Sequence, residues 1–276
     1  MSKGYYYLVA SLPQLRLDDY KEPYRVNEFV GELFEHLTPR HCRYVRDFLY
    51  GYDSPHIADA LLGKETARPG QPGNWSFAEI KIQMQMPEAE RDSYLSSVLS
   101  GFHDLKKNKE ALPRPEVESL VAAVYYKKMR AHENRLLREY FRFDWRLRNI
   151  LAALNKRKFP SMGAEFLEIE EDPDIEQLKT SAQNDFGLSR EVDYLPGLLE
   201  AFGKGDVLHL EKYVDLLRWR QVDDLNLFKY FEIDVLLGYL IKLMLVERWI
   251  LLDERRGQEV LAVRTEVNES RLYQAH

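Results

Sequence analysis

The chain lacks features that mark several large classes of protein. Its 276 residues include a single cysteine, Cys42, which excludes an internal disulfide and favours a reducing compartment. The formal net charge of −6 at pH 7 argues against general nucleic-acid binding, which needs a basic surface to replace counterions. The most apolar segment, 235–252, is interrupted by charged residues, whereas a membrane-spanning helix needs about 18 apolar residues in a row. The N-terminus lacks the apolar core and cleavage site of a signal peptide, so we expect a cytoplasmic protein.

Motifs of known chemistries are also missing. The chain has no glycine-rich dinucleotide motif, no P-loop, no Cys-x-x-Cys pair and no His-Glu-x-x-His zinc motif. Its histidines form no Glu-x-x-His repeat of the kind that holds iron in helical bundles. We therefore expect no catalytic residue, no cofactor and no metal. The alternative is a cytoplasmic helical enzyme with an unrecognised site of carboxylates and histidines.

Helical periodicity is what the sequence does contain. Charged residues make up 30% and apolar residues 45%, as in an ordinary globular protein with a substantial core. Helix formers dominate, β-branched residues are sparse, and one apolar stripe recurs at helical spacing up to residue 154. The sequence predicts an all-α protein, with a bend or break near 129–134. Helices are expected over residues 26–37, 40–50, 54–62, 76–86, 88–108, 116–158, 174–184, 193–202, 205–221 and 227–252. Residues 76–86 also alternate as a strand would, and helix is favoured there because a proline follows.

Capping residues and prolines set several of these boundaries. Thr38 followed by Pro39 is typical of a helix start. Asp53, two residues before Pro55, is expected to be the N-cap of the short helix that follows it. Pro87 is expected in the first turn of the helix over 88–108.

Three stretches are expected to be irregular or weakly structured. Residues 63–74 are rich in glycine, proline and polar residues and predict a surface loop. Residues 165–174 form an acidic stretch that contains a proline. The helix that begins near 227 is expected to end by Gly257, and residues 261–267 alternate weakly, as a tail strand or a helix remnant would.

A pattern of aromatic, any residue, aromatic, aspartate occurs three times at nearly equal spacing. The copies are 50–53 (YGYD), 141–144 (FRFD) and 231–234 (FEID, with isoleucine for the second ring). Their aspartates, Asp53, Asp144 and Asp234, lie 91 and 90 residues apart, close to one third of the chain. A fixed period predicts a chain built from copies of one unit. We expect three similar helical units of about 90 residues in one body, over residues 1–90, 91–175 and 176–276.

The repeated aspartates are interpreted as structural residues of the repeated unit. Asp144 lies between Tyr140 and Leu147 on an apolar stripe, and Asp234 occupies the corresponding place in the last copy. A charge there must be paired or must sit where a helix begins. An N-cap and a buried pairing with arginine or lysine therefore both stay open for these two, and catalysis is a distant third interpretation.

Charge is unevenly distributed along the chain. Residues 114–158 carry 12 basic and 5 acidic residues, and residues 165–200 carry 2 basic and 11 acidic residues. These segments either pack against each other or give the body two ends of opposite sign. Two clusters at predicted helix ends are candidate partner surfaces: Lys156, Arg157 and Lys158, and Arg218, Trp219 and Arg220. Helix capping is the alternative role of the first cluster, and a half-buried tryptophan with solvated neighbours is that of the second.

Parts of the chain resemble a known family. Residues 143–151 (FDWRLRNIL), followed by Lys156, resemble a helix signature of a central-stalk subunit of V/A-type ATPases, the one designated C, or d in eukaryotes. Residues 239–250 (YLIKLMLVERWI) look like the last-repeat helix of that family. Residues 5–13 (YYYLVASLP) are similar to a divergent bacterial branch of unassigned function, encoded beside V-type ATPase genes.

This resemblance implies a funnel of three similar helical units around a pseudo-threefold axis. Such a funnel seats the rotating shaft on the membrane ring and has no catalytic residues. The expected function is thus a non-catalytic subunit of a V-type rotary ATPase that transports ions or protons. Its partners would be the shaft and ring subunits, and it would lie at the inner membrane without inserting into it. A helical-repeat adaptor unrelated to ATPases is a further alternative.

Overall fold

A computed structural model describes residues 4–18, 24–64, 72–107, 109, 111–161 and 173–252, apart from the side chain of residue 174. All regular secondary structure in these residues is helical, which confirms the all-α prediction. The helices are α1 (Tyr6–Ser11), α2 (Val26–His36), α3 (Pro39–Leu61), α4 (Phe77–Gln85), α5 (Ser93–Lys106), α6 (Arg114–Arg130), α7 (Arg135–Lys158), α8 (Pro173–Thr180), α9 (Leu195–Gly203) and α10 (Val207–Asn226). A further helix over residues 233–252, which we call the last helix, has no label in the figures.

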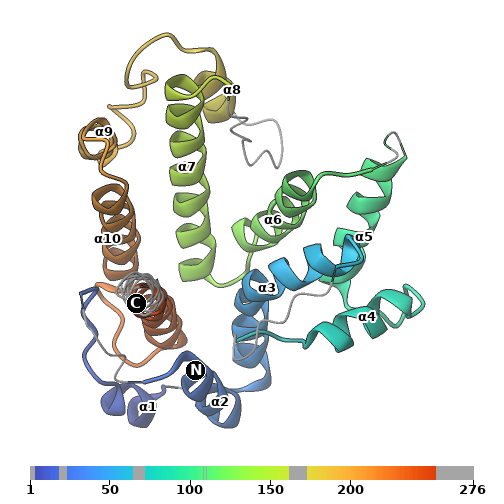
Figure 1. Cartoon of the computed structure of the whole chain (residues 1–276). Coiled ribbons are helices and arrows are strands. Elements are labelled where there is room, and N and C mark those ends of the chain that lie inside the picture. Colours follow the sequence, from blue (N-terminus) through green and yellow to red (C-terminus); the bar gives the residue numbers. More distant parts are fainter. Residues whose placement is uncertain are drawn as a thin grey trace, which may run out of the picture.

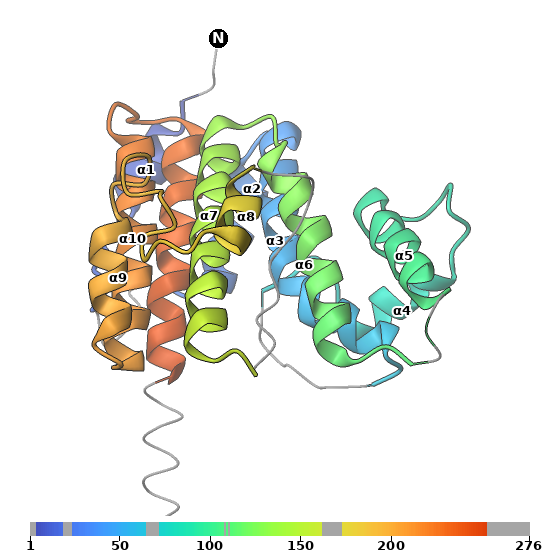
Figure 2. The same ribbon diagram turned by 90° about the horizontal axis from the view of Figure 1, so that it is seen from above.

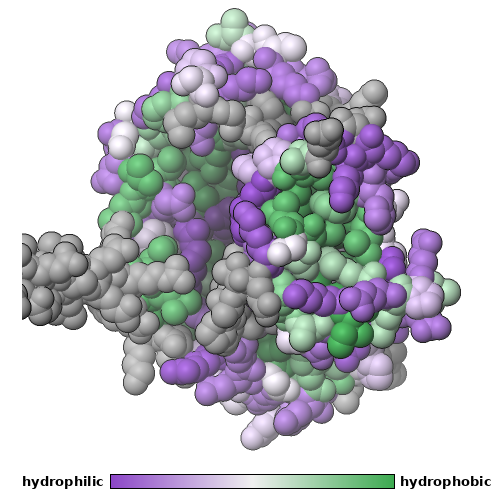
Figure 3. Space-filling view, turned by 45° about the vertical axis from the view of Figure 1, so that its right-hand side comes forward, coloured by the Kyte–Doolittle hydropathy of each residue, from purple (hydrophilic) through white to green (hydrophobic). Residues whose placement is uncertain are grey.

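The helices form a bundle with an arm on one side. α7, α10 and the last helix run side by side, with α9 beside α10 (Figures 1 and 2). α6 packs against both α3 and α7 and so joins this group to the rest of the body. α4 and α5 form the arm, which is attached through α3 and α6 (Figure 2). The face in Figure 3 is hollowed, and hydrophobic side chains reach its surface in patches.

Two clusters of buried apolar side chains hold this arrangement together. The larger cluster draws on residues from Tyr5 to Leu243 and includes side chains of α2, α3, α5, α6 and the last helix. The smaller cluster is formed by the second half of α7 with α8, α9 and α10. α7 contributes to both clusters, because its stripe of apolar residues runs along most of its length. Each buried leucine or phenylalanine contributes about 1.5–3 kcal/mol of transfer free energy.

Several predicted boundaries are confirmed, and local chemistry explains them. The Thr38 side chain accepts a hydrogen bond from the His41 backbone N–H at the start of α3, next to Pro39. The break between 129 and 134 separates α6 from α7, because the Asn134 side chain accepts the Leu137 N–H (3.0 Å) and caps α7. The segment 76–86, which also alternates as a strand would, is α4, which begins with a capping box of Ser76 and Glu79.

The predicted break at residues 51–53 is wrong. α3 runs without interruption from Pro39 to Leu61 and carries Pro55 in its interior, so Asp53 is not an N-cap. An internal proline removes one helical hydrogen bond and costs about 3 kcal/mol. Here both halves of the helix are buried, with Leu49 before the proline and Ile57 after it, and this packing offsets the loss.

Two helix starts also differ from the sequence-based expectation. Pro87 lies outside α5, which begins at Ser93 because the Asp92 carboxylate accepts the N–H groups of Tyr94 (2.8 Å) and Leu95 (3.3 Å). The last helix begins at 233 instead of 227, after a turn that follows α10. α1 is a helix that the sequence pattern does not predict. The tail over 261–267, the end at Gly257 and most of the expected loop and acidic stretch lie outside the described residues.

Candidate functional site

Asp144 is buried in the middle of α7 and is surrounded by donors. The Arg218 Nε lies 2.7 Å from its Oδ1, and the Arg148 Nε lies 3.1 Å from its Oδ2. The Tyr126 hydroxyl donates to the same Oδ2. Burial alone would raise the pKa of Asp144, but the two guanidinium groups and the hydroxyl hold that pKa well below its usual value. The interpretation of Asp144 as a buried acid paired with arginine is therefore confirmed.

Arg218 extends this pairing to a second buried carboxylate. Its Nη1 lies 2.8 Å from Oδ1 of Asp215, one turn away on α10. Oδ2 of Asp215 accepts hydrogen bonds from Arg248 (2.8 Å) and from the Trp249 indole N–H (2.9 Å). We call Asp144, Arg218, Asp215 and Arg248 the ion-pair chain. It joins α7, α10 and the last helix through charge-assisted hydrogen bonds.

Asp53 is also fully buried but has partners of another kind. Its Oδ1 accepts the backbone N–H groups of Asn74 (2.9 Å) and Trp75 (3.3 Å), and its Oδ2 accepts the Asn74 side-chain amide (2.8 Å). Burial raises the pKa of Asp53 to about 6, although these N–H groups lower it in part. The carboxylate thus holds the segment before α4 against α3.

Asp234 differs again, because it lies one residue inside the last helix. Its Oδ1 accepts the Asn134 side-chain amide at 2.6 Å, and the Lys229 Nζ lies 3.6 Å from its Oδ2. Asp234 is therefore not the N-cap of this helix, and the lysine near it comes from the preceding turn and not from a neighbouring helix. The three repeated aspartates share burial on a helix but have different partners.

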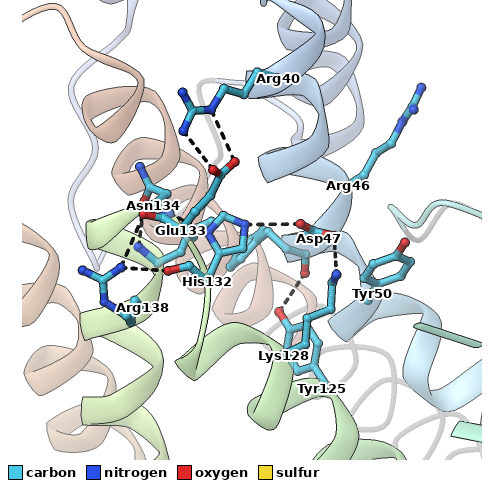
Figure 4. A network of polar contacts seen from close by, with 12 residues as sticks. Arg40, Arg46, Asp47, Tyr50, Tyr125, Lys128, His132, Glu133, Asn134 and Arg138 are labelled. Carbon is cyan, nitrogen blue, oxygen red and sulfur yellow. Dashed lines mark hydrogen bonds and ion pairs between the residues drawn. The ribbon is translucent and has the colours of Figure 1, made fainter. Parts of the chain in front are cut away.

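The contact from Asn134 continues into a polar network at the junction of α6 and α7 (Figure 4). The Asn134 backbone N–H donates to Nδ1 of His132 (3.0 Å), so Nε2 carries the ring proton and donates to Asp47 (3.2 Å). Lys128 also pairs with Asp47, at 3.1 Å. Burial raises the pKa of Asp47, but His132 and Lys128 lower it by more, so that it stays below its usual value. This network fixes α3 to the junction.

In the candidate surface on α10, the side chain of Arg218 pairs with carboxylates inside the protein. Arg218, Trp219 and Arg220 lie within α10, which continues to Asn226. The Arg218 side chain is only 12% exposed, because it belongs to the ion-pair chain. Trp219 is half-buried, and the Lys242 Nζ lies 4.6 Å from its ring centroid. Arg220 alone of the three is exposed, so the half-buried tryptophan has one solvated neighbour and not the two that the alternative expects.

The other candidate surface lies at the end of α7, as the sequence predicts. Lys156, Arg157 and Lys158 are exposed. Arg157 turns back toward the segment after α8, where it donates to the backbone carbonyl of Gln183 (2.6 Å) and lies 3.6 Å from the centroid of the Phe186 ring. α7 also packs against α8, so in the described residues the basic and acidic segments pack together.

An exposed aromatic cluster at one end of the bundle is a feature that the sequence reasoning misses. We call it the aromatic end, and it consists of Tyr6, Tyr7, Leu227, Phe228, Tyr230 and Phe231. It combines α1 with the turn between α10 and the last helix. The dense aromatic residues of 5–7 and 227–231 are the signal that could have found it. In the sequence analysis, however, residues 5–7 are part of the family resemblance, and residues 227–231 lie next to and within the third copy of the repeated pattern.

Two negative findings apply to the described part of the chain. No group of three or more histidine, cysteine, aspartate or glutamate residues there is placed to hold a metal ion. None of the described helices combines the length and the hydropathy that a bilayer crossing requires.

Fold and site together define an all-helical protein whose buried carboxylates join helices to one another. The chain belongs to the family DUF2764, which is described as a protein of unknown function and whose model matches residues 1–267. No curated protein matches the chain, and no solved structure does.

Proposed function

We propose that this protein is a non-catalytic subunit of a V-type rotary ATPase. It couples the central shaft to the membrane rotor ring by protein contacts, on the cytoplasmic side of the inner membrane. Three helical units of about 90 residues, arranged as a funnel, are part of this proposal. The proposal rests on the resemblance to the funnel-shaped central-stalk subunit of V/A-type ATPases. It also rests on the ion pairs that join the two segments in which this resemblance is densest.

The ion-pair chain is the observation that carries the proposal. The resemblance is densest in residues 143–151 of α7 and in residues 239–250 of the last helix. Asp144 in the first segment and Arg248 in the second belong to the same ion-pair chain, through Arg218 and Asp215. Residues from two distant segments thus help to join the same three helices. This is expected if the residues shared with the family determine how the helices pack.

The surroundings of the aspartates support a structural role over a catalytic one. Asp53 is the strongest feature for the enzyme alternative, because a buried acid with a raised pKa is typical of catalytic sites. Its side chain, however, has no exposed surface, and both oxygens accept hydrogen bonds from the protein itself. Asp144 is held ionised by arginines, which suits a joint between helices better than proton transfer.

Purification of the membrane ATPase from the source organism tests the proposal. The intact complex, isolated in mild detergent through a tag on a catalytic subunit, should contain this chain in a constant ratio to the shaft subunit. A tagged copy of the chain should in turn recover shaft and ring subunits. The same purification from cells in which the shaft gene is deleted is the control. Absence of the chain from complexes that retain both shaft and ring would refute the proposal.

A further inference from the structure

The aromatic end brings together large side chains with much of their surface exposed. Phe228 is 80% exposed and Tyr7 is 78% exposed, and three of the other four side chains are about two-thirds exposed. Contiguous apolar patches of several hundred Å² mark interaction sites on soluble proteins. Aromatic side chains are also enriched in the centres of protein interfaces.

The aromatic end is a built surface, because contacts between distant segments hold it together. The Tyr5 backbone N–H donates to the Phe231 carbonyl oxygen at 2.7 Å. The rings of Tyr6 and Phe231 lie 4.3 Å apart between centroids. Both views place α1 beside the turn that precedes the last helix (Figures 1 and 2). The exposed rings are therefore presented in a defined arrangement, and less conformational entropy is lost on binding.

The charges at the aromatic end argue for a protein partner over a lipid surface. Lys229 is the cation of the turn, and it is already paired with Glu232 at 2.5 Å and lies 3.6 Å from Asp234. Binding to anionic lipid depends on cations that are free to face the headgroups. The chain is acidic as a whole, which disfavours such a surface further.

We propose that the aromatic end is the surface through which two copies of this chain associate. Six large side chains exposed to this extent offer on the order of 800 Å², which is the area that each partner buries in a standard interface. A two-fold axis places the same patch on both sides, so a patch must complement itself. Tyrosine and phenylalanine rings do so in edge-to-face pairs. This inference does not depend on the proposed function.

Sedimentation equilibrium of the full chain over a wide range of protein concentration tests the inference. We expect a monomer–dimer equilibrium for the wild type. Phe228→Ser and Tyr7→Ser, which lie on the two different segments, should each raise the dissociation constant about tenfold or more. Both side chains are exposed, so circular dichroism and the thermal midpoint should stay close to those of the wild type.

Ile82→Ser is the matched control. Ile82 is an apolar residue of α4 that is 55% exposed and lies outside the aromatic end, so its replacement should leave the dissociation constant unchanged. A wild type that stays monomeric at the highest concentration would overturn the inference, and so would a dimer that neither substitution weakens. A monomer that sediments with phosphatidylcholine vesicles would overturn it in favour of a lipid surface.

Discussion

Two buried aspartates are stabilised by different kinds of partner. Asp53 is bound by N–H groups of residues 74 and 75, which we call the Asp53 corner, and Asp144 is bound by the ion-pair chain. Both aspartates are buried on long helices and follow the same short sequence pattern. N–H groups of Asn74 and Trp75 surround the first, and the arginines Arg218 and Arg148 surround the second. Burial raises the pKa of Asp53, whereas the cations overcome burial and lower the pKa of Asp144. The kind of partner, and not the depth of burial, therefore decides in which direction the pKa of a buried acid shifts.

Of the substitutions that test this comparison, removal of the Arg218 cation should lower the stability of the protein most. Arg218→Met leaves the carboxylates of Asp144 and Asp215 close together with one fewer positive group between them. We expect the free energy of unfolding to fall by about 3–5 kcal/mol, because an unpaired buried charge is costly. Urea denaturation followed by circular dichroism measures this change. Arg220→Met, an exposed arginine two residues away, is the control and should change stability by about 0.5 kcal/mol or less. Equal effects of the two substitutions would contradict the ion-pair chain.

Disturbing the Asp53 corner should have a smaller effect. A Cβ at Gly73 would lie 2.6 Å from Oδ1 of Asp53, so Gly73→Ala must push the carboxylate or the backbone of the loop aside. We expect the free energy of unfolding to fall by about 1–3 kcal/mol, as is typical when a new group is forced against a buried, well-packed side chain.

Gly31→Ala is the matched control for this substitution. A Cβ at Gly31 in α2 has no heavy atom within 4 Å, and alanine favours helix by up to about 1 kcal/mol over glycine. The control should therefore be neutral or stabilising in the same thermal melts. A Gly73→Ala protein as stable as the wild type would show that the loop does not rely on Asp53.

The contributions of Asp53 and Asp144 to stability should change with pH in opposite directions. The folded-state pKa of Asp53 is raised to about 6, so the folded protein binds more protons than the unfolded chain between about pH 4 and pH 6. The stability of the wild type relative to Asp53→Asn should therefore fall as the pH rises through this window, by on the order of 1 kcal/mol per pH unit at most.

Asp144 should behave in the opposite way. Its folded-state pKa is lowered, so its contribution is fully present above the unfolded pKa of about 4 and is lost as the pH falls below that value. Relative to Asp144→Asn, the wild type should show a flat profile above about pH 5 and a decline in acid. Urea denaturation at a series of pH values gives both differences. A rising Asp53 difference between about pH 4 and pH 6 would show that the N–H groups outweigh burial.

The sequence alone predicts the helical class, the cap at Thr38 and the break before Asn134. Each of these depends on a few neighbouring residues, and local signals of this kind are visible without a fold. The same local reasoning misplaces Asp53 as an N-cap. The packing of α3 against other helices offsets the free-energy cost of Pro55 inside it, and no local sequence pattern reveals this packing.

The partners of the charged residues were decided only by the tertiary structure. Arg218 lies 74 residues from Asp144 and looks like an exposed residue of an interface cluster until α10 is placed against α7. The exposure of the aromatic end likewise depends on the contact of Tyr5 with Phe231, which lie far apart in the sequence. Helical periodicity in the sequence predicts which residues lie on one face of a helix. Only the packing of the helices determines which residues that face contacts, because burial and charge pairing arise between segments that are distant in sequence.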